Sequence, residues 1–292
     1  MHPWAGAGTV AVAVALLPMA SCSPVAHSLY IHFHKAGGTS ACTAIHAAGH
    51  NTGGGSCNCF HSIHGFRPLV NSGNATAVAR AMDARRVDVC AIEHGAAWPT
   101  PEVFRNKLKP LWNGTFATML RDPWSRFKSA YMRVYQIEHS NGHTLNIEKF
   151  ASAKGDHLQN VKEWGCFNRP NYYVRFLNGI GNCDEHGLMT DNHLQNAKTV
   201  LEAFDHVFVT ESNATATEMA DYLNAPNPIK MPPQSNSKFS KYGGNDRHNA
   251  PPTQHFMANF YTTNKLDYQL YMWTLTRHNL SAEYTPALYL SS

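Results

Sequence analysis

Residues 29–40 (LYIHFHKAGGTS) place a lysine and two glycines directly after an apolar run. The run over 29–33 predicts a buried β-strand, and the loop that follows it contains Lys35, Gly37 and Gly38. Glycine lets the backbone approach a phosphate without a Cβ in the way, and lysine supplies a full positive charge. These residues therefore predict a binding site for an anion.

A helix N-terminus is expected to complete this site. Thr39 is a suitable N-cap for a helix that begins near Ser40. The first N–H groups of such a helix converge on an anion, and the helix dipole adds partial positive charge. The loop is not a Walker A motif, because its lysine precedes the glycines. Taken alone, the stretch also fits a plain βα turn with a solvated lysine.

Polar residues also follow the next two predicted strands. Residues 87–92 (VDVCAI) predict a buried strand with His94 close behind it, and residues 115–120 (TFATML) predict another that runs into Arg121. Ligands of parallel α/β sheets bind beyond the carboxyl ends of the strands. We therefore expect Lys35, His94 and Arg121 to converge on one crevice.

The remaining pattern alternates helices and strands. Asp122 and Pro123 predict the start of a helix whose Arg126 and Arg133 are expected on a solvated basic face. This alternation predicts an α/β fold with a mostly parallel sheet covered by helices on both faces. The other predicted elements are helices over 75–86, 192–204, 212–223 and 253–278, a helical or extended segment over 171–177, and a strand over 206–210.

The length suits one large α/β domain or two small ones. The chain has 292 residues, of which 43% are hydrophobic, and a net charge of +4, which suits an acidic ligand without indicating nucleic acid. Residues 1–26 contain a short apolar core, typical of a signal peptide or an uncleaved signal anchor. Four N-glycosylation sequons agree with secretion, at Asn74, Asn113, Asn213 and Asn279.

Cysteines and a long loop leave further alternatives open. Six cysteines follow the N-terminal segment, and Cys166 with Cys183 would close a short disulfide loop. A cluster of Cys57, Cys59, His61 and His64 fits either disulfides or a zinc site. Residues 224–252 form a loop rich in Pro, Asn, Ser and Gly, in which Lys238, Lys241 and Tyr242 could close over a ligand.

Two segments together resemble the Golgi carbohydrate sulfotransferases of the heparan sulfate 2-O and 6-O type. Lys35-Ala-Gly-Gly-Thr39-Ser40 resembles the family's loop for the 5′-phosphosulfate of 3′-phosphoadenylyl sulfate (PAPS). Residues 120–131 (LRDPWSRFKSAY) resemble its 3′-phosphate segment, in which an arginine is followed by a serine eight positions on, here Arg121 and Ser129. Looser matches extend the resemblance over residues 29–242, and Ala36 stands where the family commonly has Thr.

The resemblance implies a P-loop-like three-layer sandwich over residues 27–292 that transfers a sulfuryl group from PAPS to a glycan hydroxyl. It implies His94 as the base, with Glu93 as the rival, Lys35 as the group that stabilises the leaving phosphate, PAP as the product, and no metal. The expected PAPS contacts are Lys35, Ala36, Gly37, Gly38, Thr39, Ser40, Arg121 and Ser129. The expected location is the Golgi lumen, with or without a membrane anchor, or outside the cell. A glycan-binding protein without turnover and a nucleotide-dependent kinase are the alternatives.

Overall fold

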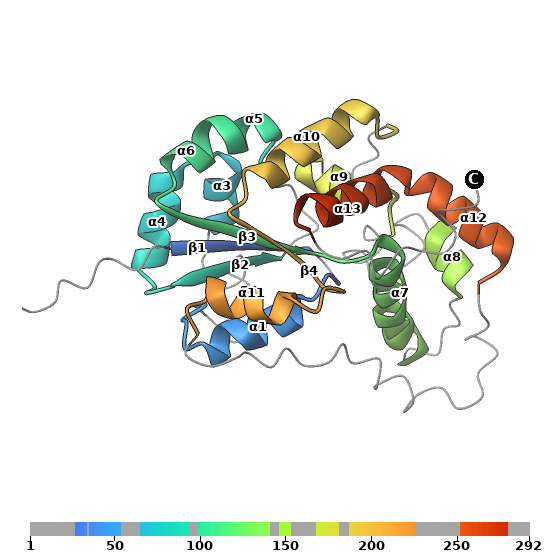
Figure 1. The fold of residues 1–292 in the computed structure, drawn as a ribbon, viewed down its shortest axis with the longest axis horizontal. Helices are drawn as coiled ribbons and strands as arrows, with labels where there is room; N and C mark the ends of the chain where they lie inside the picture. The colour runs from blue at the N-terminus through green and yellow to red at the C-terminus, as the bar shows by residue number, and fades with distance from the viewer. Residues whose placement is uncertain are drawn as a thin grey trace, which may run out of the picture.

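Four parallel strands form the centre of the molecule. In the computed structural model they lie in the order β2-β1-β3-β4, so each predicted strand is present and every pairing is parallel (Figure 1). The structure describes residues 27–33, 35–53, 65–93, 98–140, 146–152, 168–180, 187–225 and 252–279. The strands are β1 (His27–His32), β2 (Val89–Glu93), β3 (Gly114–Leu120) and β4 (His206–Val209).

Helices cover both faces of the sheet, as predicted. One face packs on α1 (Gly38–Ala47) and α11 (Thr215–Tyr222), around a small core that includes Tyr30 and Phe208. The larger core lies on the other face of the sheet. The helices that cover it are α3 (Phe66–Asn71), α4 (Ala75–Asp83), α5 (Pro101–Val103), η1 (Phe104–Leu108), α6 (Lys109–Leu111), α9 (Tyr172–Leu177), α10 (Asp191–Glu202) and α13 (Lys265–Arg277). The expected three-layer α/β sandwich is confirmed.

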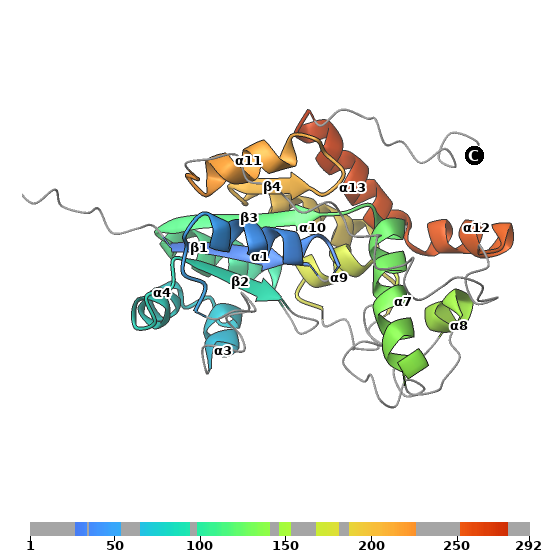
Figure 2. The same ribbon diagram turned by 90° about the horizontal axis from the view of Figure 1, so that it is seen from below.

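A third group of helices extends beyond the carboxyl end of β3. Figures 1 and 2 show α7 leaving the sheet there, with α8 and α12 beside it. Their bounds are α7 (Pro123–Ser140), α8 (Ile147–Ser152) and α12 (Gln254–Thr263). An aromatic cluster joins them, because Phe127 of α7 lies with its ring centroid 4.8 Å from that of Phe260 and 5.3 Å from that of Phe150. This group therefore forms one wall of the sheet edge at which the predicted polar residues lie.

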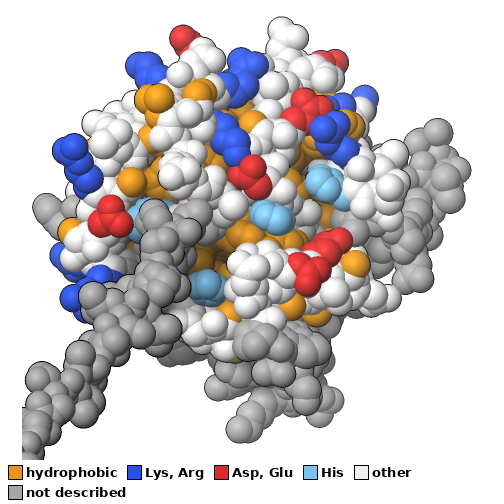
Figure 3. Space-filling model, turned by 60° about the vertical axis from the view of Figure 1, so that its left-hand side comes forward, with side chains coloured by type: hydrophobic (Ala, Val, Ile, Leu, Met, Phe, Trp, Pro, Cys, Tyr) orange, Lys and Arg blue, Asp and Glu red, His pale blue; other side chains and the backbone are white. Residues whose placement is uncertain are grey.

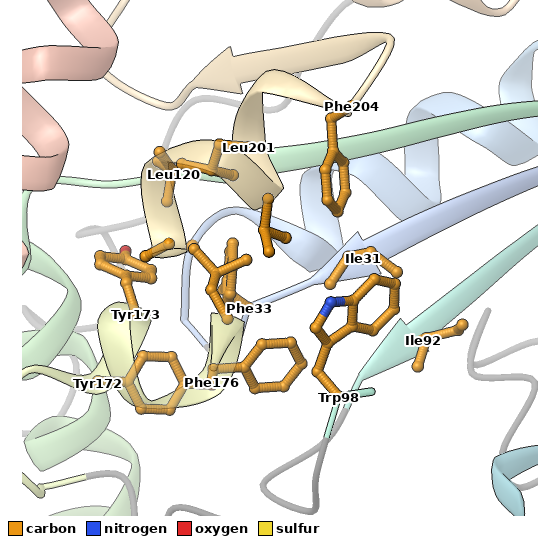
Figure 4. Close-up of a cluster of buried hydrophobic side chains, with 14 of the residues drawn as sticks. Ile31, Phe33, Ile92, Trp98, Leu120, Tyr172, Tyr173, Phe176, Leu201 and Phe204 are labelled. Atoms are coloured by element: carbon orange, nitrogen blue, oxygen red, sulfur yellow. The ribbon is translucent and has the colours of Figure 1, made fainter. Parts of the chain in front are cut away.

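Helix α9 packs on the carboxyl end of β1. Phe33, the residue after β1, meets Tyr173 and Phe176 edge to face, with ring centroids 4.9 Å and 5.1 Å apart. Figure 4 shows these rings gathered in the core, with Tyr173 near Leu120 at the end of β3. Aromatic burial thus brings α9 to the point where β1 and β3 end.

Helices α9 and α13 cap each other. Asn171 Oδ1 accepts hydrogen bonds from the N–H groups of Leu266 and Asp267 in the first turn of α13, at 3.1 Å and 3.2 Å. The Asp267 carboxylate in turn accepts from the N–H groups of Tyr173 and Val174 in the first turn of α9, at 3.1 Å and 3.0 Å. First-turn donors of both helices are therefore satisfied across the interface rather than by local caps.

Several helix boundaries differ from the predicted ones. Helix α4 ends at Asp83 and not at Arg86, which adopts a left-handed φ of 53° that a helix does not continue through. Ser212, expected as the cap of a helix, lies before α11, whose N-cap is Ala214, and the final helical region is divided at Asn264 into α12 and α13. The helices within the described ranges are each too short or too polar to cross a membrane.

Candidate functional site

The chain changes direction across the sheet between β1 and β3. From β1 it moves to β2 on one side, and from β3 it moves to β4 on the other. Such a switch point leaves a space beyond the carboxyl ends of the two central strands, where α/β proteins bind ligands. Lys35 follows β1 and Arg121 follows β3, so the two predicted cationic residues lie at this switch point.

The turn after β1 is tightly built. The N–H of Ala36 donates to the carbonyl of Phe33 at 3.1 Å, and both Lys35 and Gly37 adopt left-handed φ angles, of 64° and 84°. A Cβ on Gly37 would lie 2.5 Å from Met119 Sδ, and one on Gly38 would lie 1.4 Å from His32 Nε2. A Cβ at either position would therefore require the side chain of Met119 or His32 to shift, independently of any ligand.

Helix α1 starts within this turn. It begins at Gly38 with Gly37 as the N-cap, so the prediction that Thr39 caps a helix from Ser40 is wrong. Gly37 takes the N-cap position because it alone adopts the left-handed backbone there without a Cβ penalty. The first three N–H groups of α1 have no acceptor within their own helix, and they open toward the switch point with the positive end of the helix dipole.

Arg121 joins the two sides of the switch point. Its Nη1 donates to the carbonyl of Lys35 at 3.4 Å, and its Nε lies 3.7 Å from Glu211 Oε1. Its main chain is clamped by Tyr173, whose hydroxyl accepts from the Arg121 N–H at 3.1 Å and donates to the Arg121 carbonyl at 2.9 Å. The structure therefore brings together Lys35 and Arg121, two of the three residues expected to converge.

Glu211, the second residue after β4, is the other charged group here. Its two carboxylate oxygens each accept from the Asp122 N–H at 3.2 Å, and Oε2 also accepts from the Tyr271 hydroxyl at 3.1 Å. Burial, reinforced by the charge of Asp122, raises the pKa of Glu211 to about 7, and Arg121 opposes this shift. Glu211 is thus near its titration midpoint at neutral pH.

Asp122 has the structural role that the sequence predicts. Its Oδ1 accepts from the N–H of Ser125 at 2.8 Å, which caps α7, and Pro123 is the first residue of that helix. The side chain is 1% exposed, and burial raises its pKa. Asp122 therefore fixes where α7 leaves β3 and contributes negative charge behind Arg121.

Arg126 lies in the core, so the prediction of a solvated face is wrong for this residue. It is 1% exposed, and its guanidinium lies 4.3 Å from the ring centroid of Tyr172. The pKa of Asp267 is raised to about 6, because burial raises it by more than the main-chain N–H groups of α9 and the charge of Arg126 together lower it. Arg126 therefore supports the α9–α13 junction. Arg133 is exposed, as expected.

The residues predicted to contact PAPS differ in how far their side chains are buried. Ala36 and Gly38 are buried, and Thr39 is exposed at the start of α1 beside half-buried Ser40. Ser129 is half-buried on α7, six residues and therefore about 9 Å along the helix from Pro123.

The predicted base lies outside the described residues. His94 is not described, and neither is the side chain of Glu93. The backbone of Glu93 pairs with that of His32, so β2 ends at the same edge of the sheet as β1.

Other expectations also fall outside the described residues. They are the N-terminal segment 1–26, the cluster of Cys57, Cys59, His61 and His64, the pair Cys166 and Cys183, and the loop residues Lys238, Lys241 and Tyr242. Within the described ranges, no group of three or more His, Cys, Asp and Glu side chains is arranged to hold a metal ion.

Sequence reasoning did not assign the residues that hold Arg121. Glu211, Tyr173 and Tyr271 are not among the site residues that the sequence predicts. A signal for Glu211 was present, because it follows β4 just as Arg121 follows β3. Compared with models of known protein families and with curated proteins, the chain matches none.

Proposed function

We propose that this protein is a sulfotransferase that moves a sulfuryl group from PAPS to a hydroxyl of a glycan. One observation carries the proposal: Arg121 Nη1 lies 3.4 Å from the Lys35 carbonyl, so the turn after β1 and the residue after β3 meet. PAPS carries phosphate groups at two separated positions, and cationic residues from two neighbouring strand ends suit such a ligand. The resemblance of the two segments to carbohydrate sulfotransferases supplies the sulfuryl chemistry.

The groups at the switch point fit this ligand by charge and hydrogen bonding. The first-turn N–H groups of α1, from Gly38 onward, would hold the 5′-phosphate with help from the Thr39 and Ser40 hydroxyls. Arg121 would bind the 3′-phosphate through paired N–H donors, a geometry that guanidinium groups share with phosphates. Ser129 is assigned to the same phosphate on the resemblance.

Each catalytic residue has one task. When bound, PAPS supplies a sulfuryl group whose S–O bond to the 5′-phosphate breaks as the acceptor oxygen forms a new S–O bond. His94 takes the proton of the acceptor hydroxyl, which suits a group that titrates near neutral pH, and Glu93 is the alternative base. Lys35 neutralises the charge that develops on the leaving phosphate of PAP. None of these steps needs a metal.

The carboxylates that follow the strands favour this proposal over a kinase. A kinase holds Mg²⁺ on such carboxylates. Here Asp122 caps α7 through Oδ1, and Glu211 binds Asp122 N–H, Tyr271 and Arg121. Asp122 Oδ1 and both carboxylate oxygens of Glu211 are therefore engaged by protein groups that a magnesium ion would have to displace.

Radioactive sulfate transfer tests the proposal. Full-length protein is incubated with ³⁵S-labelled PAPS and a panel of glycans, alongside Lys35→Ala, His94→Ala and the control Lys107→Ala, which removes an exposed lysine on η1. We expect transfer by the wild type and the control, and a loss of at least about 100-fold for the other two.

The outcomes separate the candidate functions. Glycan binding that does not depend on PAPS, without transfer to any glycan, would favour the glycan-binding protein without turnover. Phosphate transfer from Mg·ATP would favour the kinase. Transfer that is unaffected by both Lys35→Ala and His94→Ala would refute the assigned roles.

A further inference from the structure

Arg121 is held between two oxygen-bearing groups before any ligand is present. Its Nη1 donates to the Lys35 carbonyl at 3.4 Å, and its Nε lies 3.7 Å from Glu211 Oε1. Both distances are at the long end for their type, so these contacts are ones that a phosphate could replace. A ligand phosphate that binds the Arg121 guanidinium would therefore compete directly with Glu211.

Glu211 cannot follow Arg121 if the guanidinium moves. Its carboxylate is bound by the Asp122 N–H through both oxygens, at 3.2 Å each, and by the Tyr271 hydroxyl at 3.1 Å. These partners come from the segment between β3 and α7 and from α13, so two packed elements hold the carboxylate in place. Its position is therefore fixed while its charge can change.

Among the residues that the structure describes, the charged and titratable groups facing Glu211 are Arg121, Asp122, Tyr173 and Tyr271. Of these four, Arg121 is the cation, and Asp122 carries the same charge as Glu211. Burial is the main cause that raises the pKa of Glu211 to about 7, and Arg121 holds it from rising further. A phosphate on Arg121 would neutralise that cation and add negative charge nearby, and both effects favour the protonated carboxyl.

We propose that Glu211 is a positioning residue that holds Arg121 in the free protein and takes up one proton when the nucleotide phosphate binds Arg121. The inference rests on the proposed function, because PAPS or PAP supplies that phosphate. A protonated Glu211 retains an oxygen that accepts the Asp122 N–H, so the segment after β3 stays in place. Binding is then tighter at mildly acidic pH and weakens as the pH rises above neutrality.

The sign and size of this dependence follow from linkage. If one proton enters for each nucleotide bound, the Kd rises about tenfold for each pH unit above the pKa of Glu211 in the free protein. Phosphate groups have a second pKa of about 6, so the ligand itself contributes little between pH 7.5 and 8.5. This window isolates the protein group.

Calorimetric titration with PAP tests the inference. The full-length protein is titrated at pH 7.5 and 8.5 in two buffers with different ionisation enthalpies, which counts the protons taken up. We expect close to one proton per PAP and a Kd that is about tenfold higher at pH 8.5. Glu211→Gln, a neutral isostere, should take up none and bind with the same affinity at both pH values.

A matched carboxyl controls for general pH effects. Glu218→Gln on α11 removes another half-buried carboxyl whose pKa is raised by burial, and it should keep the wild-type proton uptake. PAP binding by the wild type with no proton uptake, or an unchanged pH dependence in Glu211→Gln, would overturn this inference and leave the proposed function standing. No PAP binding by the folded wild type would remove the proposed function, and this inference with it.

Discussion

Arg121 is placed by contacts from segments that are distant in the chain. Tyr173 clamps its main chain from α9, while Lys35 and Glu211 hold its guanidinium from the ends of β1 and β4. A side chain held on several sides loses little conformational freedom when a ligand binds it. The main chain of Arg121 is therefore fixed before the ligand arrives, while its guanidinium has to exchange Glu211 for the ligand.

Arg121→Ala should weaken PAP binding without unfolding the protein. The lost hydrogen bonds to a charged phosphate are worth about 1.5 to 3 kcal/mol, which corresponds to a Kd about 10- to 150-fold higher. Titration of PAP at fixed salt measures this change. Lys128→Ala, which removes an exposed cation from α7, should leave the Kd within about twofold. An equal rise of the Kd in both variants would mean that Arg121 contributes only positive charge and makes no specific contact with the phosphate.

Tyr173→Phe separates the clamp on the main chain from the side chain of Arg121. The variant keeps the ring that packs on Phe33 but loses the hydroxyl that binds Arg121 N–H and carbonyl. Buried polar groups left without a partner cost about 1 to 3 kcal/mol. We expect a lower free energy of unfolding in urea and weaker PAP binding. Unchanged values for both would show that the clamp has no effect.

At the scale of elements, the turn from β1 into α1 allows a matched test. Gly37 and Gly49 have nearly the same φ, 84° and 85°, but a Cβ on Gly37 would lie 2.5 Å from buried Met119 whereas one on Gly49 would meet nothing within 4 Å. Gly49→Ala should cost about 1 to 2 kcal/mol from left-handed strain alone. Gly37→Ala should cost about 1 to 3 kcal/mol more through overpacking.

Urea unfolding of the two variants measures this difference. Wild-type protein is the reference, and the m-value shows whether the unfolded state has changed. Equal losses of stability in Gly37→Ala and Gly49→Ala would mean that Met119 yields, and that packing does not require glycine in the turn.

Asp267 ties α9 to α13 and should be among the costliest side chains to remove. Asp267→Ala would leave the N–H groups of Tyr173 and Val174 without their acceptor and would take a carboxylate away from buried Arg126. Breaking one side of such an arrangement costs about 3 to 5 kcal/mol. Thermal unfolding of Asp267→Ala beside Lys128→Ala, which should change stability by no more than about 0.5 kcal/mol, checks this expectation.

The strands and the residues at their ends were predictable because both depend on local sequence. Apolar runs such as residues 29–33 specify buried strands, and residues that follow parallel strands necessarily meet at one edge. The cap of α9 was not predictable, because Asp267 supplies it from a distant part of the chain. Arg126 was misplaced for the same reason: Tyr172, which covers it, belongs to another helix.

At the scale of the whole molecule, charge is distributed rather than concentrated on the face in Figure 3. The Lys and Arg side chains there alternate with Asp, Glu and uncharged residues. At the switch point two cationic residues, Lys35 and Arg121, meet the start of α1, with Glu211 and Asp122 beside Arg121. The net charge of +4 therefore suits recognition of a small anionic ligand at one place.

The four sequons give the last prediction, which concerns the surface. Asn74, Asn113, Asn213 and Asn279 are all exposed. Asn74 caps α4 by accepting the Ala77 N–H through Oδ1, which leaves the amide nitrogen, the atom that carries an N-linked glycan, outside that bond. We therefore expect N-glycans at these asparagines when the protein passes through a secretory pathway.

Peptide mass spectrometry after enzymatic deglycosylation in H₂¹⁸O identifies the modified positions, since each released glycan leaves an ¹⁸O-labelled aspartate. Each Asn→Gln variant should remove one glycan, as seen by a stepwise gain in mobility on a denaturing gel. Asn224, which is exposed but precedes Ala-Pro and so lies outside any sequon, is the internal control. If all four exposed sequon asparagines stay unmodified when the full-length chain, with its own N-terminal segment, is expressed in eukaryotic cells, the expected passage through the secretory pathway is contradicted.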